Sequence, residues 1–193
     1  MVKRRINVPP MVSDLIRNGL TAMEGVAFTQ RERCPSCGGY LQGYDARDRL
    51  FVTLIEESGT RDIMVQVKRF SCRTCGQVSS ADAPFYPDTR YGSPVVDLAL
   101  ALTQTMSYRR VANVLALCHI AIDWGTVRHY HRRLGPVVPT FDMYGIPLPL
   151  SLLYLSILAV QLTKGTPITG AEALAACCPP SAHGTFPVLA GSL

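Results

Sequence analysis

One segment in the first half of the chain alternates hydrophobic and polar positions in a way that is typical of a β-strand. Residues 61–70 alternate between aliphatic and more polar side chains, with Val65 and Val67 on the aliphatic side. The apolar run at 49–55 predicts a second strand, and the polar, glycine-containing segment at 56–60 predicts the turn between them. These segments together predict an antiparallel β-hairpin.

From Ser93 onward, apolar residues recur at the spacing of an α-helix. Ser93 and Pro94 predict a helix start, with the serine as N-cap and the proline at the first helical position. A second helix is predicted over 107–117 and a third over 123–134, which Gly135 ends. The period of the pattern therefore changes from two to about 3.6 residues within one chain.

The N-terminal 33 residues predict a basic arm and one short helix. The arm holds the cationic cluster Lys3-Arg4-Arg5, and Pro9 and Pro10 stand directly before an amphipathic segment. Gly19 is expected to end this helix, because glycine is a common residue just beyond a helix C-terminus.

Residues 143–163 carry no charged side chain, which raises the question of a membrane span. Two prolines at the start of the segment leave roughly 13 uninterrupted apolar residues, fewer than the ~20 that a span needs. A buried helix is therefore expected in preference to a membrane helix. The 29 residues that follow, 165–193, contain one charged residue, Glu172, and predict no particular element.

Four of the seven cysteines form two Cys-x-x-Cys pairs, Cys34 with Cys37 and Cys72 with Cys75. Each pair is followed by glycine, which permits the tight backbone turn of a metal-binding knuckle. Four thiolates complete a tetrahedral shell, so the pattern predicts one structural Zn²⁺ in a zinc ribbon. The alternative, two thioredoxin-like redox pairs, is less favoured because neither pair lies between a buried strand and a helix.

The other cysteines carry weaker signals. Cys118 lies at an apolar helix end and is expected in the core despite the adjacent His119. Cys177, Cys178 and His183 could form a partial metal site, but the sequence offers no fourth ligand for it.

Charge and composition narrow the class of protein. Hydrophobic residues make up 48% and charged residues 17% of the 193 residues, which favours a packed core over disorder. The net charge of +5 is uneven, because residues 1–135 sum to +6 and residues 136–193 to −1. A basic first part suits a polyanion, although it is also compatible with ordinary surface charge. The basic N-terminus is not followed by an apolar stretch, so a signal peptide is not expected. A reducing, cytoplasmic location is expected instead.

Residues 107–134 have the pattern of a helix-turn-helix. The second of its two helices would lie in a DNA major groove, with Val127, Tyr130 or His131, and Leu134 facing the first helix. Arginine binds guanine or phosphate, and the opposite face contains three arginines and no acid. The expected DNA-contacting residues are Thr126, Arg128, His129, Arg132 and Arg133, with Arg109 and Arg110 of the first helix on the backbone. The alternative is an αα-hairpin with a solvated basic face.

The predicted fold class is α+β, a small zinc ribbon followed by a helical domain and a helical or irregular tail. The predicted parts are a basic arm with a short helix at 1–33, the zinc ribbon at 34–80, a linker at 81–92, the helix-turn-helix domain at 93–135 and an apolar segment at 136–193.

The order of these parts resembles the N-terminal half of a prokaryotic insertion-sequence transposase, and an archaeal one in particular. The resemblance rests on CPSCGG, CRTCG, FYPDTRYGSPVVDLALAL and SYRRVANVL…DWGTVRHYHRRL, over residues 34–135. It implies that the protein binds double-stranded DNA at the terminal repeats of the element. It also implies a ribonuclease-H-like catalytic domain with three carboxylates that hold two divalent metals.

The sequence departs from the family at this last point. Beyond Asp123 the chain has only Asp142 and Glu172, and 58 residues after Gly135 are too few for such a domain. The chain is therefore expected to bind DNA without catalysing transposition, as a truncated transposase or a separately encoded DNA-binding subunit. Residues 136–193 would then be what remains of the region before the catalytic domain.

Two other functions are compatible with the same sequence. A zinc-ribbon transcription regulator would use the same groove contacts on a different DNA target. A membrane-attached adaptor would insert residues 146–162 and bind protein through the ribbon. The partners expected under the transposase-like function are double-stranded DNA and either a catalytic transposase subunit or a second copy of the chain.

Overall fold

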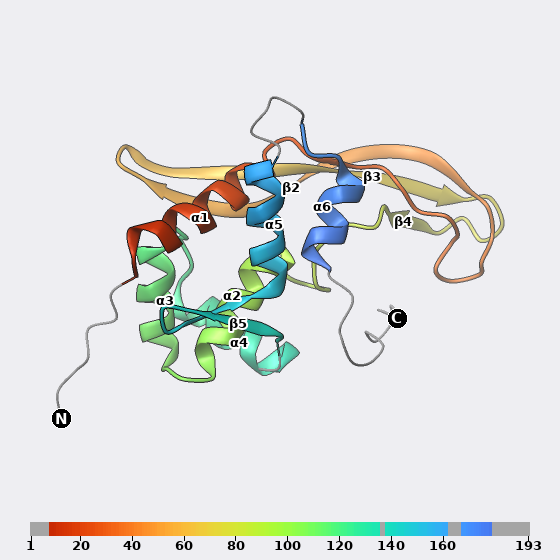
Figure 1. Cartoon of the computed structure of the whole chain (residues 1–193). Helices are drawn as coiled ribbons and strands as arrows, with labels where there is room; N and C mark the ends of the chain where they lie inside the picture. Colours follow the sequence, from red (N-terminus) through yellow and green to blue (C-terminus); the bar gives the residue numbers. More distant parts are fainter. Residues whose placement is uncertain (1–7, 136–137, 162–166, 179–193) are drawn as a thin grey trace.

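The computed structural model describes residues 8–135, 138–161 and 167–178. It has an α+β fold in which a long β-hairpin runs along one side of a group of helices (Figure 1). The predicted fold class is thus confirmed at the level of α+β. The basic cluster at 3–5 lies outside the described residues.

The hairpin is formed by β2 (Leu41–Glu56) and β3 (Gly59–Cys72). The two strands pair antiparallel, from Leu41 opposite Cys72 to Glu56 opposite Gly59. Both predicted strands are confirmed, but β2 begins eight residues earlier than expected, at residue 41 rather than 49. The extension from 41 to 48 is mostly exposed on both faces, so it lacks the hydrophobic alternation by which a strand is recognised in a sequence.

Two short strands complete this sheet along β3. β1 (Ala27–Phe28) pairs parallel with β3 at Gln66 and Val67, and β4 (Val78–Ser80) pairs antiparallel with β3 at residues 69–71. The sheet order is therefore β1-β3-β2, with β4 also on β3. The part of the hairpin that carries β4 extends away from the helices in Figure 1.

Three helices follow, and their bounds agree closely with those predicted. They are α2 (Ser93–Thr103), α3 (Tyr108–Leu117) and α4 (Trp124–Leu134). Helix α2 is central, because every residue from 93 to 102 is buried. The expected cap of α2 is wrong: the N-cap residue is Gly92, and the buried Ser93 hydroxyl makes no capping hydrogen bond.

A second pair of helices packs beside α2. Helix α1 (Pro10–Thr21) lies against α5 (Leu150–Gln161). Gly19 does not end α1 as expected, since the helix continues to Thr21. It lies instead where the two helices meet, because a Cβ atom at this position would approach the Ser156 Oγ atom to 2.6 Å.

The uncharged segment at 143–163, described as far as residue 161, contains strand residues at 143 and 146–149 and the expected helix at 150–161, which is buried on one side only. β5 (Thr140–Met143) and β6 (Ile146–Pro149) form a small hairpin, and α5 follows directly. Helix α6 (Gly170–Cys177) packs against α5. Among the helices that the structure describes, none is both long and apolar enough to cross a membrane.

The segment at 81–92, expected as a linker, contributes side chains to the core. The Phe85 ring packs edge-on against that of Phe51 in β2, with centroids 6.0 Å apart. The Gly92 amide donates to the Phe51 carbonyl at 2.9 Å, and a Cβ atom on Gly92 would meet the Phe51 ring at 2.2 Å. The inner half of the hairpin and the helices therefore share one hydrophobic core.

Candidate metal centre and candidate nucleic-acid interface

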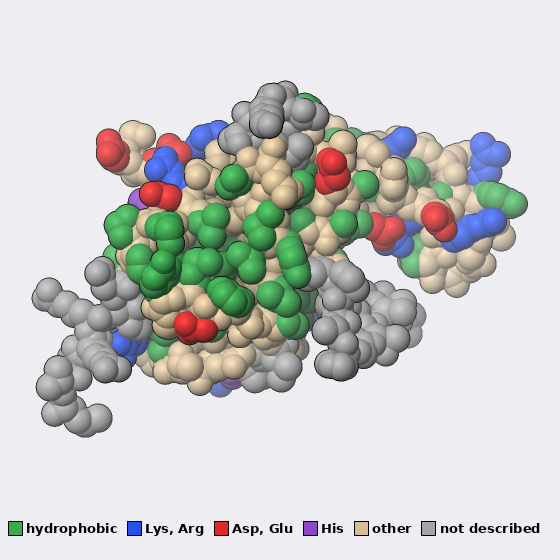
Figure 2. Space-filling view, viewed as in Figure 1, with side chains coloured by type: hydrophobic (Ala, Val, Ile, Leu, Met, Phe, Trp, Pro, Cys, Tyr) green, Lys and Arg blue, Asp and Glu red, His purple; other side chains and the backbone are tan. Residues whose placement is uncertain are grey.

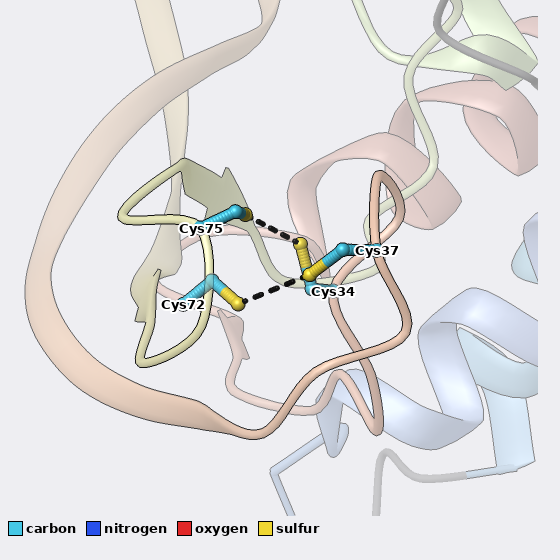
Figure 3. A group of neighbouring side chains, drawn as sticks. All are labelled: Cys34, Cys37, Cys72 and Cys75. Carbon is cyan, nitrogen blue, oxygen red and sulfur yellow. Dashed lines mark hydrogen bonds between the residues drawn. The ribbon is translucent and has the colours of Figure 1, made fainter.

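The four predicted cysteine ligands converge at the outer end of the hairpin (Figure 3). The Sγ atoms of Cys34 and Cys75 are 3.7 Å apart, those of Cys37 and Cys72 are 3.5 Å apart, and all four lie within 4.8 Å of one another. Ligands of a tetrahedral thiolate site at about 2.3 Å from the metal are about 3.8 Å from each other. Among the described residues, these four cysteines are the group that can hold a metal ion.

The two Cys-x-x-Cys turns have the same backbone structure. In each turn the amide of the glycine after the second cysteine donates to the carbonyl of the first, at 2.9 Å for Gly38 to Cys34 and 2.9 Å for Gly76 to Cys72. Both glycines have positive φ, 69° and 72°, a conformation that other residues rarely adopt. The glycine that follows each pair in the sequence is therefore required by the turn.

Close contact between the two turns fixes their relative position. The Arg73 amide of one turn donates to the Tyr40 carbonyl beyond the other at 3.0 Å. A Cβ atom on Gly39 would lie 2.6 Å from the Thr74 Oγ1 atom and 3.0 Å from the Cys72 Sγ atom. The second glycine of Cys-Pro-Ser-Cys-Gly-Gly thus provides the space in which the turns meet.

Backbone amides favour thiolates at the first cysteine of each pair. The amide of Cys75 is the main group that lowers the pKa of Cys72, to about 6. The amides of Ser36 and Cys37 likewise lower the pKa of Cys34. At Cys37 the Gly39 amide lowers the pKa, but the thiols of Cys75 and Cys72, together with desolvation and the thiol of Cys34, outweigh it and raise the pKa to about 12. Crowded thiols cannot all ionise without a cation, which is the condition that a bound metal meets.

The four sulfur ligands alternate between buried and exposed along the chain. Cys34 and Cys72 are buried, whereas Cys37 and Cys75 are exposed. A metal held by all four thiolates would have no open position for water or substrate, so its role would be structural. The sulfur contacts of 3.7 and 3.5 Å each join a cysteine of one pair to a cysteine of the other.

The remaining cysteines lie elsewhere. Cys118 is fully buried in the core, as expected, and burial raises the pKa of its thiol to about 12. Cys177 is buried and Cys178 is exposed at the end of α6. His183, the third residue of the expected partial site, lies outside the described residues.

Helix α4 presents a buried face and a basic exposed face. Val127 and Tyr130 are buried, and the Nδ1 atom of His131 lies 2.9 Å from the Thr103 Oγ1 atom of α2. On α3 the inward residues are Val111, Val114 and Leu115, as predicted. The exposed residues of α4 include four of the expected DNA contacts, Arg128, His129, Arg132 and Arg133. Helix α4 contains no aspartate or glutamate.

Asp123 caps the N-terminus of α4. Its Oδ1 atom accepts hydrogen bonds from the amides of Gly125 at 2.7 Å and Thr126 at 3.0 Å, and its Oδ2 atom accepts one from the Thr126 hydroxyl at 2.5 Å. The Thr126 hydroxyl is the main group that lowers the pKa of Asp123. The expected start of the helix at Asp123 is therefore confirmed, and the hydroxyl of Thr126 is used within the protein.

Arg133 and Arg109 interact with other side chains of the protein. Arg133 forms an ion pair with Asp88, and both side chains are well exposed. The guanidinium of Arg109 lies over the ring of Trp124, 5.5 Å from its centroid. Arg109 and Arg110 are both exposed at the start of α3. The basic surface thus spans the beginning of α3 and the outer face of α4.

Sequence reasoning missed a buried polar cluster around Asp97 of α2. Its Oδ1 atom accepts a hydrogen bond from the Tyr86 hydroxyl, and its Oδ2 atom accepts one from the Ser151 hydroxyl, both at 2.6 Å. Burial raises the pKa of Asp97. A clue was available, since an aspartate in an otherwise apolar helix needs partners, but the partners come from distant parts of the chain.

Sequence reasoning also missed two tyrosines at the metal-binding end. Tyr40 and Tyr44 are exposed, with the guanidiniums of Arg33 and Arg69 at 4.3 and 5.4 Å from their ring centroids. Tyr44 lies at a bulge in β2, which leaves it without a partner residue on β3. A bulge is not visible in a single sequence.

Comparison with known proteins found no matching family model, no matching curated protein and no matching solved structure.

Proposed function

We propose that this protein binds double-stranded DNA sequence-specifically, with α3 and α4 as a helix-turn-helix and α4 in the major groove. The observation that carries the proposal is the exposed face of α4, where Arg128, His129 and Arg132 occur together and the helix has no acid. Arginine on a groove-lying helix can bind guanine bidentately or pair with phosphate.

The position of each side chain suggests a different role. Arg128 and Arg132 are one helical turn apart, so their side chains lie on the same side of α4 and are the proposed base contacts. Arg133 is paired with Asp88 and is the proposed phosphate contact, because phosphate can replace the carboxylate as its partner. Arg109 and Arg110 are proposed to contact the DNA backbone from α3.

We further propose that the cysteine cluster binds one structural zinc ion in a zinc ribbon. Cys34, Cys37, Cys72 and Cys75 have the ligand type, number and spacing that a closed zinc site requires. The outer part of the hairpin has few buried side chains, so the metal would supply the stability that a core supplies elsewhere.

The proposed biological setting is recognition of insertion-sequence ends by a transposase-like protein. The support for it is the order of the cysteine turns and the two helices along the chain. A zinc-ribbon transcription regulator is the second candidate, because the same groove contacts would serve it. Terminal inverted repeats flanking the gene, or a neighbouring frame that encodes a carboxylate triad, would favour the first over the second.

Binding without strand cleavage is part of the proposal. The test is to incubate the purified protein with labelled DNA and Mg²⁺ or Mn²⁺ and to look for nicks or joined strands. Intact DNA is expected. Cleavage that copurifies with the protein and is removed by chelation would overturn this part of the proposal.

The test of DNA binding uses a library of duplexes measured at several salt concentrations. Arg128→Ala should cost about 1–3 kcal/mol and relax the preference at one base position. Arg133→Ala should weaken all sequences alike and lower the salt slope by about one. Arg17→Ala, at an exposed arginine of α1, is the matched control and should change neither quantity.

A second readout follows α4 directly. Trp124 is the only tryptophan of the chain, and it is the first residue of α4. Its fluorescence should change when DNA binds to wild-type protein. The proposal fails, and α4 is not a DNA-binding helix, if affinity and salt slope are the same in all variants and DNA does not change the fluorescence of Trp124.

A further inference from the structure

Helix α5 is apolar on all sides, yet only one side of it is buried. Its buried residues, such as Leu152, Leu155 and Ala159, face α1, α2 and α6. Tyr154 and Ile157 are on the other side and are exposed. A helix that is hydrophobic on all sides is normally buried on all sides, so the exposed half is unusual for a protein surface.

The exposed half of α5 belongs to a larger apolar patch. Figure 2 shows hydrophobic side chains gathered over α1, α5 and the nearby strands, with few charged side chains among them. We call this surface the α5 patch, and define it as the exposed large hydrophobic residues of α5 and of two elements packed against it, α1 and the β5–β6 hairpin. It includes Met11, Phe141, Tyr144, Tyr154 and Ile157, each between two-fifths and seven-tenths exposed.

We infer that the α5 patch is the contact surface between two copies of this chain, which pair through their α5 helices about a two-fold axis. This inference goes beyond DNA binding and does not depend on it. In such a pair the same surface is used by both copies, so it must be complementary to itself.

The absence of charge on α5 supports a second copy as the partner. Residues 150–161 contain no acid and no base, so two identical faces can meet without placing like charges opposite each other. A helix that lies on a membrane surface instead carries lysine and arginine along its polar edge, and α5 has neither.

The size of the α5 patch is sufficient for a small interface. Five large side chains that are about half exposed present roughly 500 Å² per copy, if each is worth about 200 Å² when fully exposed. Two copies would bury roughly 1,000 Å², which is the lower bound for a specific interface. We therefore expect a dimer that dissociates on dilution.

The pairing has a geometric consequence for Ile157. In an antiparallel helix pair, residues near the middle of the helix meet their own counterparts across the two-fold axis. Ile157 is close to the middle of α5 (Leu150–Gln161), so a charge at this position would face the same charge in the partner.

The experiment is sedimentation velocity of the full chain without DNA, over a range of concentrations. Wild type should shift with concentration from the 21.1 kDa monomer to a species of twice that mass. Ile157→Glu should weaken self-association at least tenfold. Val78→Glu is the matched control, because Val78 of β4 is also β-branched and also 41% exposed, but lies outside the α5 patch. It should associate like wild type.

Two variants of opposite charge at Ile157 test whether misfolding explains a loss of self-association. Ile157→Glu and Ile157→Lys should each be monomeric alone and should form a heterodimer when mixed, because opposite charges then face each other. Recovery on mixing is possible only if both variants are folded.

Three results would overturn the inference: wild type that stays monomeric at the highest concentration, Ile157→Glu that associates as wild type does, or association that requires lipid vesicles. None of these bears on whether α4 binds DNA, since that is measured separately on single duplex sites. A dimer that forms without DNA affinity would in turn support the α5 patch and refute the DNA proposal.

Discussion

Leu54 of β2 and Ile120 form an antiparallel β-bridge that joins the hairpin to the segment between α3 and α4. Two hydrogen bonds flank the bridge: the Ile55 amide donates to the His119 carbonyl at 2.7 Å, and the Ala121 amide donates to the Thr53 carbonyl at 2.9 Å. At about 3.3 Å per residue, the part of β2 between this bridge and its start at Leu41, beside the cysteine cluster, has a path of roughly 43 Å. The hairpin thus connects the candidate metal centre with the turn that positions α4.

Metal content should depend on the four clustered cysteines. Protein prepared without added zinc should contain one zinc ion per chain, and Cys72→Ser should lose it because three thiolates leave the shell incomplete. Metal binding of this type contributes on the order of 10 kcal/mol to folding, so the variant should also unfold at a lower temperature. Elemental analysis and calorimetry provide the measurements. Cys178→Ser, at an exposed cysteine outside the cluster, is the control; zinc retained in full by Cys72→Ser contradicts the prediction.

Removal of the metal should loosen one end of the hairpin only. Residues 41–48 are mostly exposed, whereas Phe51, Val52 and Leu54 are buried in the core that the hairpin shares with the helices. A chelator should therefore speed amide exchange in residues 34–48 and 68–77 and leave the segment around Leu54 and α2 protected. Hydrogen exchange read by mass spectrometry tests this. Equal loss of protection across the whole chain would show that the core is not stable without the metal.

The Asp123 cap should contribute to the stability of α4. Asp123→Ala removes the acceptor for two amides and one hydroxyl and should lower the free energy of unfolding by about 1 kcal/mol at pH 7. Asp123→Asn keeps one acceptor oxygen and should cost less. Because the folded pKa of Asp123 is lowered, the contribution of the charge is present above the unfolded pKa of about 3.9 and is lost as pH falls through the folded value. Urea unfolding at pH 7 and pH 3 measures the difference, and an equal cost of Asp123→Ala at both values would count against it.

The contribution of Asp97 to stability should depend on pH in the opposite direction to that of Asp123. Burial favours its neutral form and raises its folded pKa, so its contribution is complete below the unfolded pKa of about 3.9 and is lost as pH rises through the folded value. Within that window, wild type should lose up to about 1.4 kcal/mol per pH unit relative to Asp97→Asn, which cannot ionise. Unfolding of both proteins between pH 4 and pH 7 measures this. Asp14→Asn, at an exposed aspartate of α1, should leave the wild-type profile unchanged, and parallel profiles for wild type and Asp97→Asn would refute the prediction.

Features that arise from local patterns could be predicted from the amino-acid sequence. An apolar run predicted the inner part of β2, and alternation predicted β3, because its two faces differ in burial. The helical period predicted α3 and α4, because each buries a single face. The cysteine cluster was predictable because Cys-x-x-Cys followed by glycine specifies the local turn, and two such turns supply one complete set of ligands.

Features that depend on residues distant in the sequence became visible in the folded structure. Gly19 looks like a helix end in the sequence, but it is a contact point because Ser156 lies against it. Arg133 looks in the sequence like a basic side chain without a partner on a helix face, but Asp88, 45 residues away, is its partner. Helix α5 looks buried because it is uniformly apolar, yet the fold covers only one side of it. In each case the residues adjacent in the sequence give no sign of the contact. The interaction that determines the outcome involves a group that comes close only when the chain folds.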